Sequence, residues 1–343
     1  MKRLFIVLTC IMLIASCKKD SSTNVPIAER GVLTVNEGNF NWGNAGLSLF
    51  DPDKNTVNKD VFKEANGFSL GDVAQSATLI DSLLYVVVNN SAKVIVLSAS
   101  TFKQQSVISI TGSSPRYLLA VNDSIVYVTE LYANKIWIVN TKSGTVISNI
   151  AVDGETNQME KVSDQVFVAE RTKFNGAKVA QIRVINALSH QTAKVISLPT
   201  QPNSICKDMA GNIWVLTDTG GGKPAGLIAI DNSTLSVSKQ FDFPTGKTPN
   251  RLHYNTATHS LCYLLGTDVY STATTLTELP TTSLFTTTAS IPYAFDIDEK
   301  GKYYLADAID YTQSSKCFIY NADGSQSHSF NAGINTNQFV FLP

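Results

Sequence analysis

Short runs of β-branched and aromatic residues alternate with turn residues along most of the chain. Between Ser114 and Val152, for example, four such runs are separated by Asn, Asp, Gly and Ser. β-branched and aromatic side chains favour strands, and the separating residue types favour turns. Because no long apolar stretch has a 3.6-residue period, the pattern predicts antiparallel β-sheets and excludes helical repeats.

This four-strand pattern repeats along the sequence. The start of its first strand recurs at Gln75, Arg116, Gln158, Asn203, Asn250, Tyr293 and Gln338. The shortest step is 41 residues, from Gln75 to Arg116, and the longest is 47 residues, from Asn203 to Asn250. A β-repeat of this length is typical of a propeller blade. We therefore expect an all-β, seven-bladed β-propeller with four-stranded antiparallel blades.

The two chain ends are predicted to share one blade. The N-terminal unit has three predicted strands, at residues 32–36, 47–50 and 57–62. The C-terminal residues 337–342 look like an inner strand with no unit after it, so we expect them to complete the first blade and close the ring. The sixth unit is the least regular, and its Thr-rich half, 272–288, predicts a poor outer strand.

The N-terminus carries a targeting pattern. Lys2 and Arg3 precede an apolar run that is too short to span a bilayer. The run ends in Ala15-Ser16-Cys17, which resembles the cleavage site of a bacterial lipoprotein signal. We expect residues 1–16 to be a signal peptide, Cys17 to carry lipid, residues 17–29 to form a flexible tether and residues 30–343 to form the propeller. An ordinary secretory signal with an incidental cysteine is the alternative.

Composition indicates a folded protein and excludes one class of partner. Of the 343 residues, 43% are hydrophobic and 16% are charged. The formal charge is −1, and losing Lys2 and Arg3 with the signal leaves 25 basic against 28 acidic residues. Such a surface does not attract a phosphate backbone, so we expect no nucleic-acid binding. Cys206, Cys262 and Cys317 fall in different units and are predicted to be buried free thiols.

A polar and aromatic ring is predicted on one face of the wheel. In a propeller, the loops that enter the first strand of each blade and those that join its second and third strands lie on the same face. The predicted ligand-binding residues there are Asn36, Asn39, Phe40, Trp42, Asp72, Gln75, Asn89, Asn90, Arg116, Tyr117, Tyr132, Gln158, Asn203, Arg251, Tyr293, Asp307, Asp310 and Tyr311. Amides and phenols on a concave face suit a large, neutral ligand that bears amides and hydroxyls. Polar loops that are merely solvated are the alternative.

Catalytic and metal sites find less support. His190 and His328 are placed in outer turns or strands and His259 in a turn, and only His253 is placed on an inner strand, where it is alone. Six acids converge on the ring and could hold calcium, namely Asp72, Glu130, Glu170, Asp218, Asp307 and Asp310. We favour the alternative, that these acids pair with Arg116, Arg171 and Arg251 or cap loops. We expect no catalytic residue and no metal.

Five short motifs, taken together, resemble one family. They are Asn36-Glu-Gly-Asn-Phe40, Gly71-Asp-Val-Ala-Gln-Ser76, Val87-Val-Asn-Asn-Ser91, Ser114-Pro-Arg-Tyr117 and Ala306-Asp-Ala-Ile-Asp-Tyr-Thr-Gln313. In this order they resemble the YncE-like, DUF5074-type seven-bladed propeller lipoproteins of outer membranes, which include the BtuG-like cobalamin binders. The resemblance covers residues 31–343, although the insertion 171–178 and the irregular sixth unit have no counterpart in it.

The resemblance implies a non-enzymatic role. A lipid-anchored propeller at the cell surface would capture cobalamin (vitamin B12) or a related corrinoid and pass it to a TonB-dependent outer-membrane transporter. The residues carried over from the motifs are Asn36, Asn39, Phe40, Asp72, Gln75, Asn89, Asn90, Arg116, Tyr117, Asp307, Asp310 and Tyr311. Two alternatives stay open: a metal-dependent, lactonase-like hydrolase, and an interaction module for a protein or glycan without a small ligand.

Overall fold

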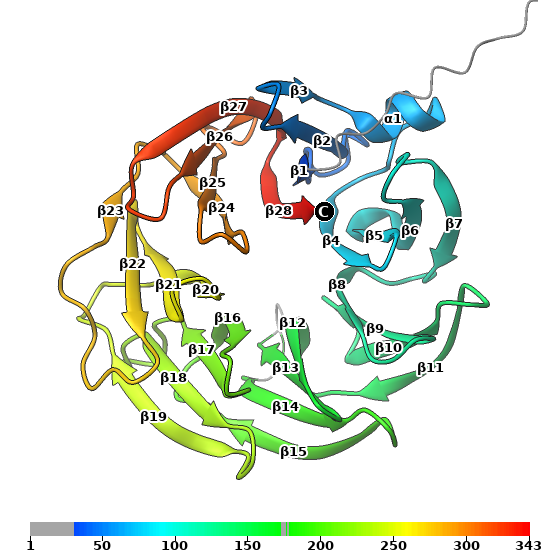
Figure 1. Cartoon of the computed structure of the whole chain (residues 1–343). Helices are drawn as coiled ribbons and strands as arrows, with labels where there is room; N and C mark the ends of the chain where they lie inside the picture. Colours follow the sequence, from blue (N-terminus) through cyan, green and yellow to red (C-terminus); the bar gives the residue numbers. More distant parts are fainter. Residues whose placement is uncertain (1–30, 173–175, 177) are drawn as a thin grey trace, which may run out of the picture.

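The strands form seven separate four-stranded antiparallel sheets, arranged as blades around a central axis (Figure 1). This computed structural model describes residues 31–172, 176 and 178–343. The prediction of an all-β, seven-bladed propeller is confirmed. The predicted signal peptide, Cys17 and the tether lie outside the described residues, as do residues 173–175 and 177 of the insertion.

Blades two to four follow the chain order, with the first strand of each blade innermost (Figure 1). Blade two comprises β4 (Ala74–Ile80), β5 (Leu83–Val88), β6 (Lys93–Ser98) and β7 (Gln104–Ser109), with the short 3-10 helix η1 (Asn89–Ser91) after β5. Blade three comprises β8 (Pro115–Ala120), β9 (Ile125–Glu130), β10 (Lys135–Asn140) and β11 (Thr145–Ala151). Blade four comprises β12 (Glu155–Val162), β13 (Gln165–Arg171), β14 (Ala180–Asn186) and β15 (Gln191–Ser197).

Blades five to seven are built in the same way. Blade five comprises β16 (Pro202–Lys207), β17 (Ile213–Thr217), β18 (Gly226–Asp231) and β19 (Ser236–Asp242). Blade six comprises β20 (Asn250–Asn255), β21 (Ser260–Leu265), β22 (Asp268–Ala273) and β23 (Phe285–Thr286). Blade seven comprises β24 (Pro292–Ile297), β25 (Tyr303–Asp307), β26 (Ser314–Tyr320) and β27 (Gln326–Ile334). The two-residue β23 confirms the poor outer strand predicted for the sixth unit.

Blade one is assembled from both ends of the described chain. Its sheet order is β28 (Thr336–Leu342), β1 (Gly31–Asn36), β2 (Gly46–Asp51) and β3 (Thr56–Asn58). β28 is antiparallel to β1, with Leu33 opposite Val340. The prediction that the C-terminal strand completes blade one is therefore confirmed. This pairing covers the edge of β1 that would otherwise be open.

The strand predicted over residues 57–62 is wrong at its C-terminal end. β3 ends at Asn58, and the helix α1 (Val61–Asn66) follows. Asp60 caps this helix, since its Oδ1 accepts a hydrogen bond from the backbone N–H of Lys63 at 3.1 Å. Gly67 ends the helix with a φ of 79°, a conformation that favours glycine. The apolar pair at the helix start fits a strand equally well, and the caps decide between the two.

The hydrophobic cores lie between neighbouring blades. In β5, Val86 packs into the cluster shared with blade one, and Val87 into the cluster shared with blade three. Because successive side chains of a strand point to opposite faces, one strand supplies both cores. Cys206, Cys262 and Cys317 are buried and free, as predicted. Burial raises the pKa of each thiol above its ordinary value.

A candidate ligand-binding face

Every inner strand carries a β-bulge near its start. In β4, for example, the pairing with β5 passes from Ala74–Val88 to Ser76–Val87, so Gln75 is an extra residue. The bulged residues of the seven blades are Asn337, Gln75, Arg116 with Tyr117, Asn157 with Gln158, Asn203, Arg251 with Leu252, and Tyr293. A bulge redirects a side chain and bends its strand. Five of the seven recurring strand starts of the sequence are therefore bulged residues, and the other two, Asn250 and Gln338, stand next to one. All seven bulges lie at one end of the wheel, here called the loop face.

Glu37 and Asn337 together link three blades at this loop face. The carboxylate of Glu37 accepts hydrogen bonds from Tyr293 Oη and from Asn337 Nδ2, both at 2.6 Å. The same Asn337 Nδ2 donates to the carbonyl of Gln75 at 2.8 Å. Burial raises the pKa of Tyr293, and the nearby negative charge of Glu37 raises it further. Sequence reasoning missed Glu37, although this acid lies inside the first of the five motifs.

Exposed aromatic side chains gather on the loop face. They are Phe40, Trp42, Phe68, Tyr132 and Tyr311, with exposed fractions from 45% for Tyr311 to 76% for Trp42. Each lies in a loop that enters an inner strand or joins the second and third strands of a blade. The other strongly exposed large apolar residues of the described chain are aliphatic, and lie near outer strands or in turns of the opposite face. We call these five residues the aromatic set; Phe68 was not predicted.

Polar contacts hold the loops of the aromatic set in place. Asn39 Nδ2 donates to the carbonyl of Tyr311 at 2.8 Å, joining blades one and seven. Asp72 Oδ2 accepts from the backbone N–H of Asn41 at 2.9 Å and from Asn90 Nδ2 at 2.5 Å, joining blades one and two. The predicted residues Asn39, Asp72 and Asn90 are thus brought together beside the aromatic set, where they position its loops.

Four predicted ligand-binding residues are buried. Asn36 is 1% exposed, and it hydrogen bonds Ser48 Oγ at 3.0 Å and Thr336 Oγ1 at 2.7 Å. Asn89 donates to the carbonyl of Pro115 at 2.8 Å, and Gln75 is also buried. Asp307 accepts from the backbone N–H groups that precede β24. These four side chains have partners inside blade one or at blade junctions, and their role as ligand contacts stays a prediction.

Other predicted residues also make internal contacts. Asn203 Nδ2 donates to Asp218 Oδ1 and to the carbonyl of Pro249, both at 2.8 Å, and Gln158 Oε1 accepts from the backbone N–H of Ile205 at 3.1 Å. Asp310 is exposed, but hydrogen bonds from Gln313 and Thr312 occupy its carboxylate and hold its pKa well below its ordinary value. These side chains join neighbouring blades or shape their own loop.

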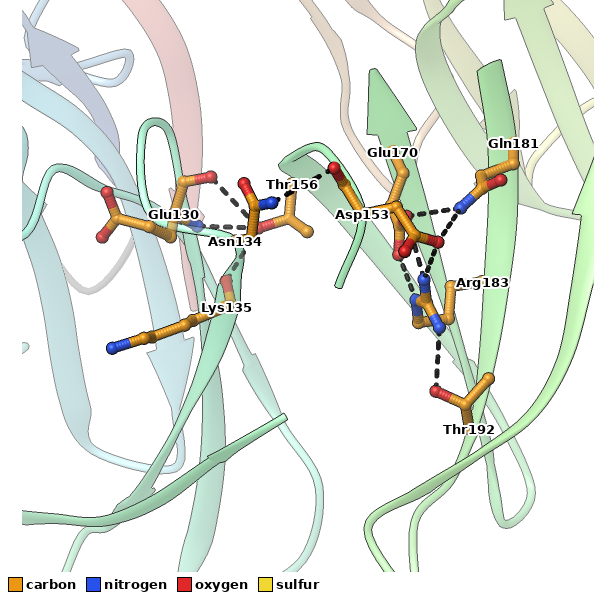
Figure 2. Close-up of polar contacts among 9 residues, drawn as sticks. All are labelled: Glu130, Asn134, Lys135, Asp153, Thr156, Glu170, Gln181, Arg183 and Thr192. Carbon is orange, nitrogen blue, oxygen red and sulfur yellow. Dashed lines mark hydrogen bonds and ion pairs between the residues drawn. The ribbon is translucent and has the colours of Figure 1, made fainter. Parts of the chain in front are cut away.

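The converging acids have partners within the protein. Glu130 accepts from the backbone N–H of Ser114 and from Trp137 Nε1, and so caps its loops. In Figure 2, dashed lines join Arg183 to both Glu170 and Asp153, and Arg183 Nη2 lies 2.6 Å from Asp153 Oδ2. Arg171 Nη2 lies 2.9 Å from Asp218 Oδ2. In the described part of the chain, no three His, Cys, Asp or Glu side chains lie close enough together to hold a metal ion.

Two details of the charge pairing differ from expectation. Glu170 pairs with Arg183, which the sequence did not single out, and Arg251 donates to the backbone carbonyls of Tyr293 and Asn337. His253 lies on an inner strand as predicted, but an acid accompanies it: its Nε2 is 3.7 Å from Asp296 Oδ1. Burial lowers the pKa of His253 to about 4 and raises that of Asp296 to about 7.

The opposite end of the wheel has a depression of about 470 Å³. It is lined by the far ends of the inner strands of blades two to five and the turns after them, at Thr78, Leu79, Ile80, Leu119, Ala120, Lys161, Ser163 and Lys207. Lys207 Nζ donates to the carbonyl of Lys161 at 3.0 Å. The sequence did not predict this depression. No helix of the described residues is long and apolar enough to cross a membrane.

Solved structures with the same architecture have distant sequences. A quinonprotein alcohol dehydrogenase-like protein from Bacteroides thetaiotaomicron is 16% identical with a TM-score of 0.70, over 93% of this chain and 80% of that chain. The periplasmic gluconolactonase PpgL of Pseudomonas aeruginosa is 11% identical with a TM-score of 0.69, over 92% and 99%. Virginiamycin B lyase from Staphylococcus aureus is 14% identical with a TM-score of 0.59, over 75% and 83%. At such identities the likeness shows the fold alone.

Sequence comparison places the chain in a family. No functionally curated protein matches it. A family described as a domain of unknown function, DUF5074, matches residues 30–337, which span all seven blades. The chain therefore belongs to the DUF5074 family.

Proposed function

We propose that this protein captures a large ligand on its loop face without transforming it, and that the ligand is cobalamin or a related corrinoid. The observation that carries the proposal is the aromatic set, five exposed rings on one face of the wheel. Exposed apolar groups gathered on one face mark an interaction site, whereas single ones scattered over a surface do not. A corrinoid is a large macrocycle with amide side chains, so rings and amides on the protein suit it.

The rigidity of the loop face supports this proposal. Asn39, Asp72 and Asn90 hold the loops of the aromatic set through hydrogen bonds, and Glu37 and Asn337 together link three blades. Binding to a preorganised surface loses little conformational entropy, so many weak contacts can add up to high affinity. The acids of the face already have internal partners, which supports binding over metal-dependent catalysis.

The proposed location and the proposed partner rest on the N-terminal pattern and the five motifs. Lipid on Cys17 would hold the propeller at the outer membrane, facing the cell surface. A TonB-dependent transporter would be the partner that receives the ligand. Capture on an exposed face, followed by transfer, requires a face that is open to solvent, and the aromatic set is open in this way.

Isothermal titration with cyanocobalamin tests the proposal directly. Residues 31–343 contain every strand of the seven blades, so a soluble protein that starts at Glu29 retains the whole wheel. We expect saturable binding at micromolar protein. Trp42→Ala should weaken it about 5- to 30-fold, because a well-placed aromatic contact contributes about 1–2 kcal/mol. Leu188→Ala is the matched control, since Leu188 is 74% exposed in a turn of the opposite face.

Three other outcomes would count against this function. The absence of heat with cyanocobalamin would reject corrinoid capture. Stoichiometric calcium or zinc in the purified protein would favour a lactonase-like hydrolase. Co-purification with an outer-membrane protein in the absence of any corrinoid would favour an interaction module for a protein or glycan, which the aromatic set would also serve.

A further inference from the structure

Arg116 differs from the other arginines that the structure describes. Arg171 and Arg183 lie in ion pairs, and Arg251 donates to two backbone carbonyls. The side chain of Arg116 makes no hydrogen bond and no ion pair with any described residue. Its Nε is buried and lacks an acceptor. A guanidinium has five N–H donors, and burying one of them unpaired is unfavourable.

Arg116 lies at the loop-face end of blade three. It is a bulged residue at the start of β8, and its Cζ lies 5.9 Å from the centre of the Tyr117 ring. The next loop of the same blade carries the exposed Tyr132 of the aromatic set. The backbone of Arg116 is held in place, because Ser76 Oγ donates a hydrogen bond to the Arg116 carbonyl at 2.7 Å. The bulge is thus held in place while the guanidinium has no partner.

Neighbouring acids do not neutralise this guanidinium. Glu155, at the start of β12, is the acid that responds to its charge: burial raises the pKa of Glu155, while Arg171 and then Arg116 lower it. Glu155 lies 3.6 Å from Arg171 Nε, and no oxygen of Glu155 lies within ion-pair distance of Arg116. The carboxylate of Glu130 in the same blade accepts hydrogen bonds from the backbone N–H of Ser114 and from Trp137 Nε1. An arginine without a carboxylate partner is suited to an anion from outside the protein.

We propose that Arg116 binds a phosphate group of the captured ligand. This inference rests on the proposed function and adds the class of chemical group that the face selects. The planar guanidinium pairs with two phosphate oxygens at once, and such charge-assisted pairs are strong where aromatic rings exclude water. Because the aromatic rings and amides of the face are neutral, the guanidinium of Arg116 would supply the charged partner for a phosphate of the ligand. The preferred ligands are then corrinoids that carry a phosphate.

A series of three corrinoids separates the phosphate from the rest of the ligand. Cobinamide lacks the phosphate, cobinamide phosphate adds it alone, and cyanocobalamin carries it as a diester. We expect the wild-type protein to bind cobinamide phosphate about 10- to 100-fold more tightly than cobinamide, the range of a hydrogen-bonded charge pair. Arg116→Gln should reduce this ratio to about 1, and Arg116→Lys should retain part of it, since lysine keeps the charge without the fork.

Lys247→Gln is the matched control for charge. Lys247 lies exposed in the loop that enters β20, on the same face, and its loss changes the net charge by the same amount. This variant should keep the wild-type ratio. The thermal midpoint of Arg116→Gln should stay close to that of the wild type, because the lost side chain makes no internal hydrogen bond and no ion pair.

The outcomes separate this inference from the proposed function. If the wild-type protein binds cobinamide and cobinamide phosphate equally, or if Arg116→Gln keeps the full ratio, the role of Arg116 is overturned while corrinoid capture stands. If Lys247→Gln lowers the ratio as much as Arg116→Gln, the preference comes from overall charge and not from Arg116. If no corrinoid binds, both proposals fail together.

Discussion

Polar side chains on the loop face divide into those with internal partners and those without. Asp307 and Asn36 are fully engaged by neighbouring backbone and side-chain groups, whereas Arg116 is not. Residue type does not distinguish them, because a buried loop cap and a ligand contact both require a polar side chain at a strand end. The partner decides the role, and it often comes from a distant part of the sequence.

The ion pair between Glu170 and Arg183 is the most buried of these interactions. The Glu170 side chain is 0% exposed and that of Arg183 is 8% exposed. Glu170→Ala leaves the guanidinium buried without its main partner, so we expect a loss of about 3–5 kcal/mol in the free energy of unfolding. Urea unfolding measures this loss. Asp153→Ala removes a carboxylate that is 65% exposed from the same arginine, and it should cost no more than about 1 kcal/mol. Equal losses in the two variants would contradict the argument.

Glu160 in β12 should give the protein a pH-dependent stability. Burial raises the pKa of its carboxyl group from 4.5 to about 7, and the charge of Lys207 only partly opposes this. Between these two values the folded state binds a proton that the unfolded state releases, so stability falls as pH rises. In Glu160→Gln this contribution is absent. The urea midpoint of the wild type should therefore drop relative to the variant between about pH 5 and about pH 8. Parallel pH profiles would show that Glu160 titrates normally.

The inner strands connect each blade to its neighbours, and we call these connections joints. Each inner strand is paired on one side only, so its open edge must find other partners. In β28, Gln338 supplies them: its Oε1 accepts from the backbone N–H of Ala77 at 2.8 Å, and its Nε2 donates to the Ala77 carbonyl at 3.1 Å. A side-chain amide thus replaces a backbone ladder between neighbouring blades. The bulges serve the same joints, because bending the strand turns side chains toward the next blade.

Gln338→Ala should weaken the joint between blades one and two. The variant loses two hydrogen bonds and leaves the backbone N–H and carbonyl of Ala77 unpaired. We therefore expect its free energy of unfolding to fall by about 1–3 kcal/mol. Chemical denaturation of the variant measures it. Gln105→Ala offers a control on the outer strand β7, where an exposed amide reaches only a nearby carbonyl; its free energy of unfolding should stay within about 0.5 kcal/mol of the wild type. A similar loss in both variants would mean that the joint contributes nothing specific.

Closure makes the seven blades one folding unit. Each hydrophobic core is shared by two neighbouring blades, so no blade has a core of its own. The cluster between blades seven and one includes Phe339 of β28 together with Val32 of β1, which joins residues from the two ends of the described chain. A break at one junction therefore affects the blades on both sides of it.

Deleting residues 336–343 should open the wheel. Blade one would lose its inner strand, and the exposed edge of β1 would promote association between molecules. We expect a lower denaturation midpoint, a broader transition and larger species on size-exclusion chromatography. Removing only Pro343, which is exposed and follows β28, should change none of these. A monomeric deletion variant with an unchanged midpoint would show that closure is dispensable.

The sequence by itself determined the blade count, the strand order within the repeats and the face on which the polar loops gather. These follow from alternation, turn residues and a repeat of fixed length, all of which are local patterns. The sequence also predicted closure of the ring, because the N-terminal unit lacks one strand and the C-terminus has one strand without a unit of its own. Only the tertiary structure decided which polar groups are engaged and which are available. Thr336 bonds Asn36 across 300 residues, and no local pattern encodes such a partner. For the same reason, the unpaired state of Arg116 became visible only when the blades were in place.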